Sequence, residues 1–161
     1  MFQVEYLGFK ISSQGLQMSD RRLKIIEAIQ PPTNRKSLQR LIGLFTFWKR
    51  FIPNFSQQTY HMRQLLKQNV DFQWSDKCEE ELLYLKKALT SRPVLMAIDF
   101  NKDVHVFCDA PERGYGHVLA QIGPVGRLHP IVYGGRATQG SEKRLSPAEM
   151  ELIVLALAIK P

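Results

Sequence analysis

The stretch from Val104 to Ile122 constrains the fold most strongly, because it predicts two β-strands joined by a glycine-bearing turn. Residues 104–107 and 115–122 are rich in β-branched and aromatic side chains, which is typical of strands. Gly114 lies at the end of the segment that joins them, where a turn needs a permissive backbone. We therefore expect a hairpin that carries Asp109 at the rim of its first strand.

The half of the chain before this hairpin predicts a short β arm followed by four helices. Residues 1–11 have the pattern of a hairpin arm, which residues 12–15 would close. Each helix that follows has a residue able to cap its N-terminus. These residues are Ser19, Thr33, Ser56, and either Ser75 or Asp76. Pro31-Pro32 would end the first helix, at Ile29, and Arg92-Pro93 would end the series.

Several short motifs, in the same order along the chain, resemble the polymerases of gypsy-type LTR retrotransposons. In the second half, Asp109 begins the pattern D-A-x-x-x-G-x-G-x-V-L-x-Q, and Glu149-Met150-Glu151 heads a predicted helix. This half resembles the ribonuclease H domain of those polymerases. The first half resembles the segment that their polyproteins carry between the polymerase palm and that domain. Its motifs are Tyr6-Leu7-Gly8-Phe9, Leu41-Ile42-Gly43-Leu44, residues 47–52 and Phe72-Gln73-Trp74.

The resemblance implies an α+β fold in two parts. Residues 1–92 would form the primer-grip hairpin of a reverse transcriptase and a small helical, thumb-like subdomain. Residues 93–161 would form a partial ribonuclease H-like fold, with a three-stranded antiparallel sheet and the first helix, incomplete at its C-terminus. Residues 152–159 are apolar all round, as expected of a helix covered on every side. Three strands cannot cover such a helix.

Composition indicates a globular protein without a membrane span. The chain has 161 residues, of which 44% are hydrophobic. No apolar run reaches the roughly 18 residues that a span requires, and the first residues lack a signal-peptide layout. We expect a soluble, intracellular protein, cytoplasmic or nuclear, with no membrane partner. Cys78 and Cys108 have neither metal-ligand nor disulfide spacing and are expected to be buried thiols.

The positive charge is concentrated in the first half of the chain. The formal net charge is +7, and residues 28–70 contain no Asp or Glu. The same stretch holds Arg35, Lys36, Arg40, Lys49, Arg50, Arg63 and Lys67. A solvated helix surface is the simplest alternative, but such surfaces usually mix charges of both signs. The pattern favours a surface that binds nucleic acid.

Two rows of residues are expected on the helix that follows Thr33. Leu38, Leu41, Ile42, Phe45 and Ile52 recur at helical spacing and form the core stripe. The opposite row is Lys36, Arg40, Gly43, Phe47 and Arg50. A glycine inside an exposed helix costs about 1 kcal/mol relative to alanine, and close approach of another surface would explain it.

The resemblance assigns a role to that exposed row. In reverse transcriptases, a Gln, a Gly and an aromatic residue spaced four apart track the minor groove of the template-primer duplex, and Gln39, Gly43 and Phe47 are similar to that row. Lys36, Arg40 and Arg50 would contact phosphates, and Leu7 and Gly8 resemble the primer-grip hairpin. The alternatives are that Gly43 permits helix packing, that Phe47 joins the core, and that Leu7 and Gly8 belong to an ordinary apolar strand.

Asp109 and Glu151 are the predicted catalytic and metal-binding residues, again by resemblance. Ribonuclease H enzymes hold two divalent cations, Mg²⁺ or Mn²⁺, with four carboxylates. Asp109 matches the aspartate of the first strand and Glu151 a glutamate of the first helix. Glu149 is instead expected to cap that helix with Ser146. The alternatives are that Asp109 ends a strand in a turn and that Glu151 is a solvated first-turn acid.

By the resemblance, the polymerase activity would need carboxylates of the palm, and the ribonuclease H activity would need four. The chain lacks the palm carboxylates and half of the ribonuclease H carboxylates, which leaves its enzymatic status uncertain. We expect that the chain alone is inactive and binds a metal only when the acidic site is completed. In one interpretation it is part of a retrotransposon Pol polyprotein that grips a template-primer duplex or RNA:DNA hybrid, and the rest of the polyprotein or a second chain completes it. In another it is a catalytically inactive, retroelement-derived protein that binds nucleic acid or a protein. A basic helical adaptor without a nucleic-acid role is a third.

Overall fold

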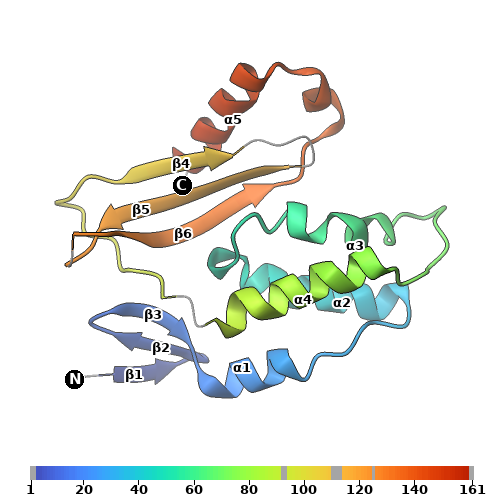
Figure 1. Cartoon of the computed structure of the whole chain (residues 1–161), viewed down its shortest axis with the longest axis horizontal. Coiled ribbons are helices and arrows are strands. Elements are labelled where there is room, and N and C mark those ends of the chain that lie inside the picture. Colours follow the sequence, from blue (N-terminus) through green and yellow to red (C-terminus); the bar gives the residue numbers. More distant parts are fainter. Residues whose placement is uncertain (1–2, 92–93, 110–113, 125, 160–161) are drawn as a thin grey trace.

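A small antiparallel sheet begins the chain in the computed structural model, which describes residues 3–91, 94–109, 114–124 and 126–159 (Figure 1). Its strands are β1 (Gln3–Tyr6), β2 (Phe9–Ser12) and β3 (Gly15–Met18), in the order β1-β2-β3. The predicted arm is therefore wrong in extent, since the residues expected to close it connect β2 to a third strand. That strand also makes an isolated bridge with Leu95, far away in the sequence.

The helical part follows this sheet. It comprises α1 (Asp20–Glu27), α2 (Arg35–Phe47), α3 (Tyr60–Gln64) and α4 (Asp76–Thr90), with 3₁₀ turns η1 (Lys49–Phe51) and η2 (Gln57–Thr59). The helix expected to begin at Ser56 is first a 3₁₀ turn and then the short α3. The prediction that the first helix reaches Ile29 is wrong, since α1 ends at Glu27. The predicted stop at Arg92-Pro93 lies outside the described residues.

Capping side chains fix where the helices begin. Asn34, not Thr33 as predicted, caps α2: its side chain accepts from Ser37 N at 2.9 Å, and Ser37 Oγ accepts from Asn34 N at 3.1 Å. Ser75 caps α4 by accepting a hydrogen bond from Cys78 N at 3.4 Å. Asp76 is therefore the first helical residue rather than the cap.

A buried carboxylate from α4 holds the start of α3. Glu81 accepts hydrogen bonds from His61 N at 2.8 Å and from Met62 N at 2.9 Å, and its Oε1 lies 2.8 Å from His61 Nδ1. These N–H groups at the start of α3 would otherwise be unsatisfied in the interior, where an unpaired donor is costly. The contact joins two helices that are twenty residues apart in the chain.

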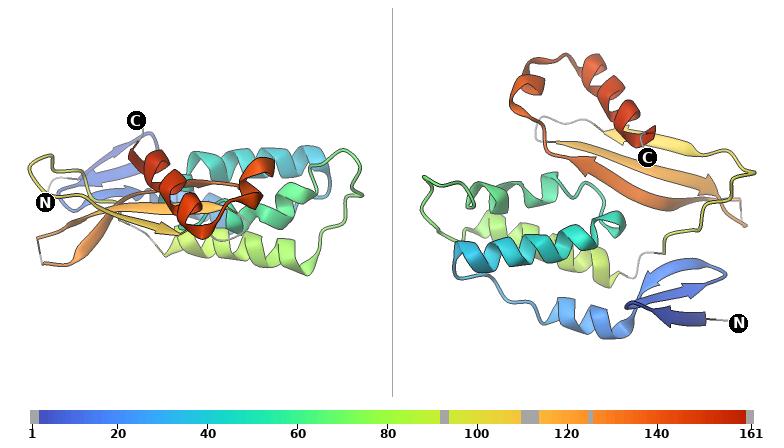
Figure 2. Two further views of the ribbon diagram at one scale, coloured as in Figure 1. Left: turned by 90° about the horizontal axis from the view of Figure 1, so that it is seen from above. Right: turned by 180° about the vertical axis from the view of Figure 1, so that it is seen from behind.

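The second sheet lies between α5 and the helical part (Figure 1, Figure 2). Its strands β4 (His105–Asp109), β5 (Tyr115–Ile122) and β6 (Leu128–Arg136) are antiparallel in the order β4-β5-β6. A 3₁₀ turn, η3 (Gly140–Arg144), then leads into α5 (Pro147–Ile159). The predicted α+β architecture is confirmed, with a second hairpin that carries Asp109 at the end of β4.

Backbone hydrogen bonds connect the two sheets. Leu16 N donates to Leu95 O at 2.7 Å, and Leu95 N donates to Leu16 O at 3.0 Å. The next residue, Met96, donates its N–H to Pro130 O of β6 at 2.8 Å. Tyr133 of β6 also packs against the core of the helical part. The division of the chain near residue 92 stays a prediction, but the two parts are in direct contact.

Candidate nucleic-acid face and acidic site

The α2 face, defined as Lys36, Gln39, Arg40, Gly43, Phe47 and Arg50, is exposed along its whole length. The predicted core stripe, Leu38, Leu41, Ile42, Phe45 and Ile52, is buried beneath it. A Cβ added at Gly43 would meet no atom within 4 Å, so the alternative that Gly43 permits packing against another helix is wrong within the described residues. The glycine leaves open space on the outside of the molecule.

Phe47 connects the α2 face to the N-terminal arm. Its side chain is 60% exposed, so the alternative that it joins the core is wrong. Its ring lies 6.1 Å from that of Phe9 in β2, and Phe9 in turn stacks on Phe51 at 5.8 Å. Aromatic pairs at these separations attract one another. The arm is thereby held beside the C-terminal end of α2.

Leu7 and Gly8 form the turn between β1 and β2. Both have positive φ angles, 49° and 81°, as a two-residue hairpin turn of type I′ requires. Leu7 is 69% exposed. The alternative that the pair belongs to an ordinary strand is therefore wrong, and the tip of the arm presents a leucine to solvent in a backbone conformation that leucine rarely adopts.

The basic residues of the stretch 28–70 have different roles. Arg35 donates to the carbonyls of Leu65 and Val70, and Arg63 donates to Thr59 Oγ1 at 2.9 Å. These two arginines are partly buried and hold the helical part together. The exposed ones are Lys36, Arg40, Lys49, Arg50 and Lys67. The exposed positive charge therefore comes mainly from α2 and η1.

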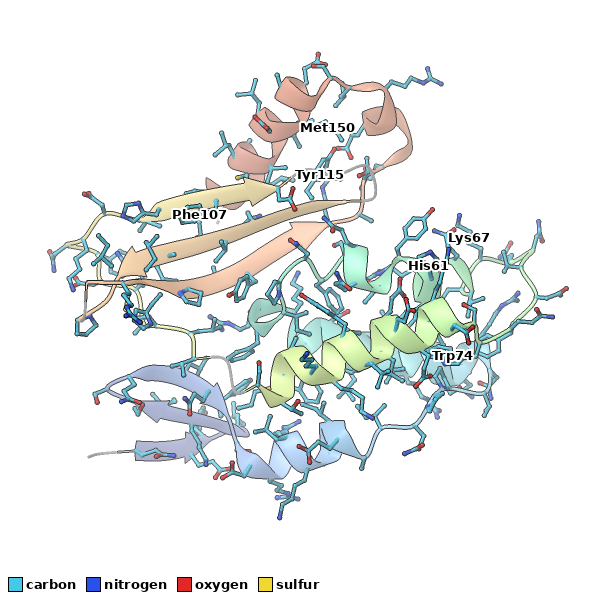
Figure 3. The ribbon with its side chains drawn as sticks, in the orientation of Figure 1. His61, Lys67, Trp74, Phe107, Tyr115 and Met150 are labelled. Carbon is cyan, nitrogen blue, oxygen red and sulfur yellow. The ribbon has the colours of Figure 1, made fainter. Side chains whose placement is uncertain are left out.

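Asp109 and Glu151 lie at the same end of the second sheet. Asp109 is the last residue of β4 and is exposed, as is Glu151 near the start of α5. Burial raises the pKa of Cys108, and the charge of Glu151 raises it further, so Glu151 is close to the residue that precedes Asp109. Met150 Sδ lies 3.5 Å from the hydroxyl of Tyr115 at this end (Figure 3). Cys108 is only partly buried, unlike Cys78, and both are free thiols.

Glu149 has the capping role expected from the sequence. Its carboxylate accepts hydrogen bonds from Ser146 N and Ser146 Oγ, both at 2.8 Å. These bonds lower the pKa of Glu149, the backbone bond most. Glu149 is thus turned back toward the start of α5, and Glu151 takes no part in these capping bonds.

Asp109 and Glu151 stay predicted metal ligands. No group of three or more His, Cys, Asp or Glu side chains gathers within the described ranges. Carboxylate oxygens suit Mg²⁺ and Mn²⁺, but two of them do not replace the larger set that a pair of cations needs. Asp109 also lines a cavity of about 230 Å³ together with Pro53, Asn54 and Tyr133.

A charged cluster beside the acidic site was not predicted. Arg136, at the end of β6, donates two hydrogen bonds to Glu142, at 2.8 and 2.5 Å, and Gln139 N donates to the same carboxylate at 2.8 Å. These bonds, that of Arg136 above all, lower the pKa of Glu142 to about 2. The guanidinium lies 5.0 Å from the ring centre of the buried Tyr115. This Arg136–Glu142 clasp fixes the turn that leads into α5.

Gln121, the last residue of the hairpin motif, has a structural role that the motif alone does not reveal. It is fully buried and accepts from Asp99 N at 2.9 Å. It also donates to the carbonyls of Asp99 and Lys102, at 2.8 and 3.0 Å. The side chain therefore holds the turn before β4.

Residues 74–161 match the model of a protein family described as the RNase H-like domain found in reverse transcriptase. The chain belongs to this family. The match includes α4, the second sheet and α5, and therefore both acids of the candidate site. It confirms the resemblance on which the interpretation of the sequence rested.

Curated relatives of this RNase H-like chain are Pol polyproteins of transposons. The Retrovirus-related Pol polyprotein from transposon 412 of Drosophila melanogaster is 31% identical over 99% of the chain. The Transposon Tf2-3 polyprotein of Schizosaccharomyces pombe is 27% identical over 98%. The chain spans only 13% and 12% of the length of these two relatives.

Solved structures with the same fold are foamy viral protease-reverse transcriptases. One in complex with double-stranded DNA has a TM-score of 0.82 at 24% identity and covers 99% of this chain and 33% of its own. Another, in complex with an RNA/DNA hybrid, has a TM-score of 0.79 at 24% identity and covers 98% of this chain and 21% of its own. At this identity the likeness shows the fold of the RNase H-like chain and of the helical part before it.

Within the described ranges, every helix is too short or too polar to span a bilayer. The intracellular location expected from the sequence stays a prediction.

Proposed function

We propose that the chain is the part of a retroelement Pol polyprotein that grips a template-primer duplex and supplies two carboxylates of an RNA:DNA hybrid hydrolysis site. The α2 face and the Leu7–Gly8 turn hold the duplex. Asp109 and Glu151 contribute to the acidic site, which the remainder of the polyprotein or a second chain completes. The observation that carries the proposal is the α2 face itself, where basic side chains flank an open glycine and an exposed aromatic ring.

The residues of the α2 face carry chemical groups that suit different contacts with a duplex. Lys36, Arg40 and Arg50 attract phosphates, and this attraction is independent of base sequence. Gly43 leaves room for the sugar edge of a groove to approach the helix. Gln39 can donate and accept hydrogen bonds at base edges, and the ring of Phe47 provides an apolar contact. Phe9 positions the Leu7–Gly8 turn beside this surface.

In the acidic site, the carboxylates of Asp109 and Glu151 provide hard oxygen ligands. Mg²⁺ or Mn²⁺, when bound there, would activate a water molecule and stabilise the leaving oxygen. The Arg136–Glu142 clasp and the cap made by Glu149 hold the start of α5, which sets the position of Glu151 relative to Asp109.

The duplex interaction is tested by charge reversal on the α2 face. In Lys36→Glu with Arg40→Glu, binding of a labelled template-primer duplex, measured by fluorescence anisotropy, should weaken at least about tenfold whatever the sequence. The slope of log affinity against log salt should decrease by about 2, because two phosphate contacts are lost. Lys77→Glu with Lys87→Glu, on exposed positions of α4, is the matched control. Equal losses in both double variants would contradict a specific α2 face.

A catalytically inactive, nucleic-acid-binding protein is the second candidate function, favoured by the incomplete set of carboxylates among the described residues. Cleavage of a labelled RNA:DNA hybrid with Mg²⁺ or Mn²⁺ distinguishes the two. We expect the chain alone to bind the hybrid without cutting it, and a longer Pol protein containing this chain to cut it unless Asp109→Asn is introduced. Cleavage by the chain alone that disappears in Asp109→Asn would show that the acidic site needs no completion. A longer protein that cuts equally well with Asp109→Asn would exclude Asp109 from the chemistry and leave binding as the function.

A further inference from the structure

A cavity of about 430 Å³ lies between the Leu7–Gly8 turn and the first turn of α1. Its walls are Glu5, Leu7, Gly8, Ser19, Arg21, Arg22 and Ile25. The turn and the helix are joined directly, because Ser19 N donates to Gly8 O at 3.0 Å. The cavity is therefore bounded by two elements that hold each other in place.

Ser19 is a buried polar residue at this cavity whose hydroxyl has no partner. The residue is 1% exposed and lies at the N-cap position of α1, yet its side chain makes no capping hydrogen bond. A serine at this position normally accepts a bond from the first turn. Here the hydroxyl of Ser19 remains without a partner at the wall of the cavity. A buried hydroxyl without a partner is costly, so a bound acceptor would relieve the cost.

Two arginines give the cavity its charge. The side chain of Arg22 lies across the turn, so that a Cβ on Gly8 would come within 2.4 Å of its Nε. Neither Arg21 nor Arg22 has a carboxylate partner among the described residues. Of the nearby acids, Asp20 bonds to Lys10 at 2.5 Å, and Glu5 lies on the cavity wall. Two positive groups against one negative wall residue favour an anion.

We propose that this cavity binds one phosphate group of a nucleic-acid strand, through the guanidinium groups of Arg21 and Arg22, the hydroxyl of Ser19 and the N-terminus of α1. Helix N-termini and arginine forks both favour phosphate. The source is a strand rather than a free ion, because the cavity adjoins the turn that the proposed function places against the duplex. The inference rests on that function and extends it from the α2 face to α1.

Three single variants test the cavity by anisotropy with the same labelled duplex. Arg22→Gln should weaken binding by about threefold to tenfold and decrease the salt slope by about 0.9, the value for one phosphate. Lys24→Gln, which removes a charge from an exposed site of the same helix, should change the affinity less than twofold. Glu5→Gln should strengthen binding, because it removes the repulsive wall residue. Equal effects of Arg22→Gln and Lys24→Gln would overturn the proposal.

Ser19→Ala separates ligand binding from folding. Because the buried hydroxyl makes no bond in the free protein, this variant should melt at or above the temperature of the wild type and still bind the duplex more weakly. A lower melting temperature with unchanged affinity would show a purely structural serine. Failure of every protein, including the wild type, to bind any duplex would instead remove the proposed function.

The backbone N–H resonances of Arg21 and Arg22 distinguish the two possible sources of phosphate. They should shift on addition of duplex, and a duplex with neutral methylphosphonate linkages should shift them much less. Inorganic phosphate should act only at far higher concentration. Saturation by inorganic phosphate with no response to duplex would overturn the assignment to a nucleic-acid strand.

Discussion

At the scale of single residues, Gly43 is a glycine that the packing of the fold does not require. An added Cβ there meets nothing, so the fold does not need a glycine at this position of α2. Glycine in a helix interior is less stable than alanine by about 1 kcal/mol. The packing of the described residues does not explain this cost, and the duplex contact proposed for the α2 face would account for it.

Gly43→Ala should stabilise the protein and weaken its binding of a template-primer duplex. The free energy of unfolding should rise by about 0.5 to 1 kcal/mol, because helix propensity improves without a clash. Duplex affinity should fall, because the methyl group occupies the open space. Denaturant unfolding and anisotropy on the same samples measure both effects. A less stable variant would contradict the open space at Gly43.

The proximity of Glu151 to the end of β4 has a chemical readout at Cys108. Burial and the charge of Glu151 both raise the pKa of this thiol. Glu151→Gln should therefore lower the pKa and speed alkylation of Cys108 about twofold to fivefold near pH 8, because the thiolate is the reactive form. Mass spectrometry resolves Cys108 from the buried Cys78. Glu149→Gln is the control, and an equal acceleration in it would mean that Glu151 is not the group responsible.

Sequence alone indicated Asp109 and Glu151 because each belongs to a motif of neighbouring residues. Glu142 escaped prediction for the opposite reason. Its partner, Arg136, comes beside it only when β6 pairs with β5 and the chain turns through η3. Ser19 looked like an ordinary helix cap, and only the structure shows that its hydroxyl is unused.

At the scale of elements, the Arg136–Glu142 clasp orients α5. It joins the end of β6 to η3, and the arginine covers the ring of Tyr115, which in turn touches Met150 of α5. Rigidity of this connection determines where Glu151 stands. The clasp depends on an ionised carboxylate and is therefore sensitive to acid.

The acid sensitivity has a defined window. The folded protein lowers the pKa of Glu142 from 4.5 to about 2. Since the folded state resists protonation, the stabilising contribution is complete above pH 4.5 and is lost as the pH falls toward 2. Glu142→Gln should flatten the decline of unfolding free energy between these pH values, as measured by denaturant titration. The same decline in both proteins would exclude the clasp as its source.

Local signals predicted some element boundaries correctly, and the errors concern which of several neighbouring residues caps, turns or ends an element. Ser75, one of the two caps predicted for α4, and Ser146 cap helices, because each needs only residues one turn away. Asn34 rather than Thr33 caps α2. The side chains of Asn34 and Ser37 each accept a hydrogen bond from the other residue's backbone N–H, which satisfies two backbone groups. The strand β3 was missed because residues 12–15 were assigned to the end of the arm, whereas they turn the chain into a local pairing with β2 from Gly15 to Met18.

At the scale of the whole molecule, the bridge between Leu16 and Leu95 joins the arm to the second sheet. Gly15 makes it possible: its φ is 126°, and a Cβ there would lie 2.2 Å from Leu95 O. The following residue, Met96, extends the connection to β6. The thumb-like part and the RNase H-like part should therefore unfold together.

Gly15→Ala should break this coupling. The wild type is expected to melt in one cooperative transition in calorimetry, with matching calorimetric and van't Hoff enthalpies. The variant should lose more than about 1 kcal/mol and show a broadened or divided transition. Gly126→Ala is the control, since that glycine also has a positive φ but open space around it. Identical melting curves for the two variants would locate the loss in backbone strain alone.

The exposed apolar side chains of α5 favour association of the chain in solution. Leu152 is 66% exposed and Leu155 38%, on a helix that is almost entirely apolar. In the described part of the chain, β4 is an edge strand with an exposed Phe107. An apolar helix and an unpaired strand edge therefore occur in the same half of the chain. Such surfaces favour clustering. Concentrated solutions of the isolated chain should scatter light more strongly than dilute ones, and mild detergent should disperse the clusters.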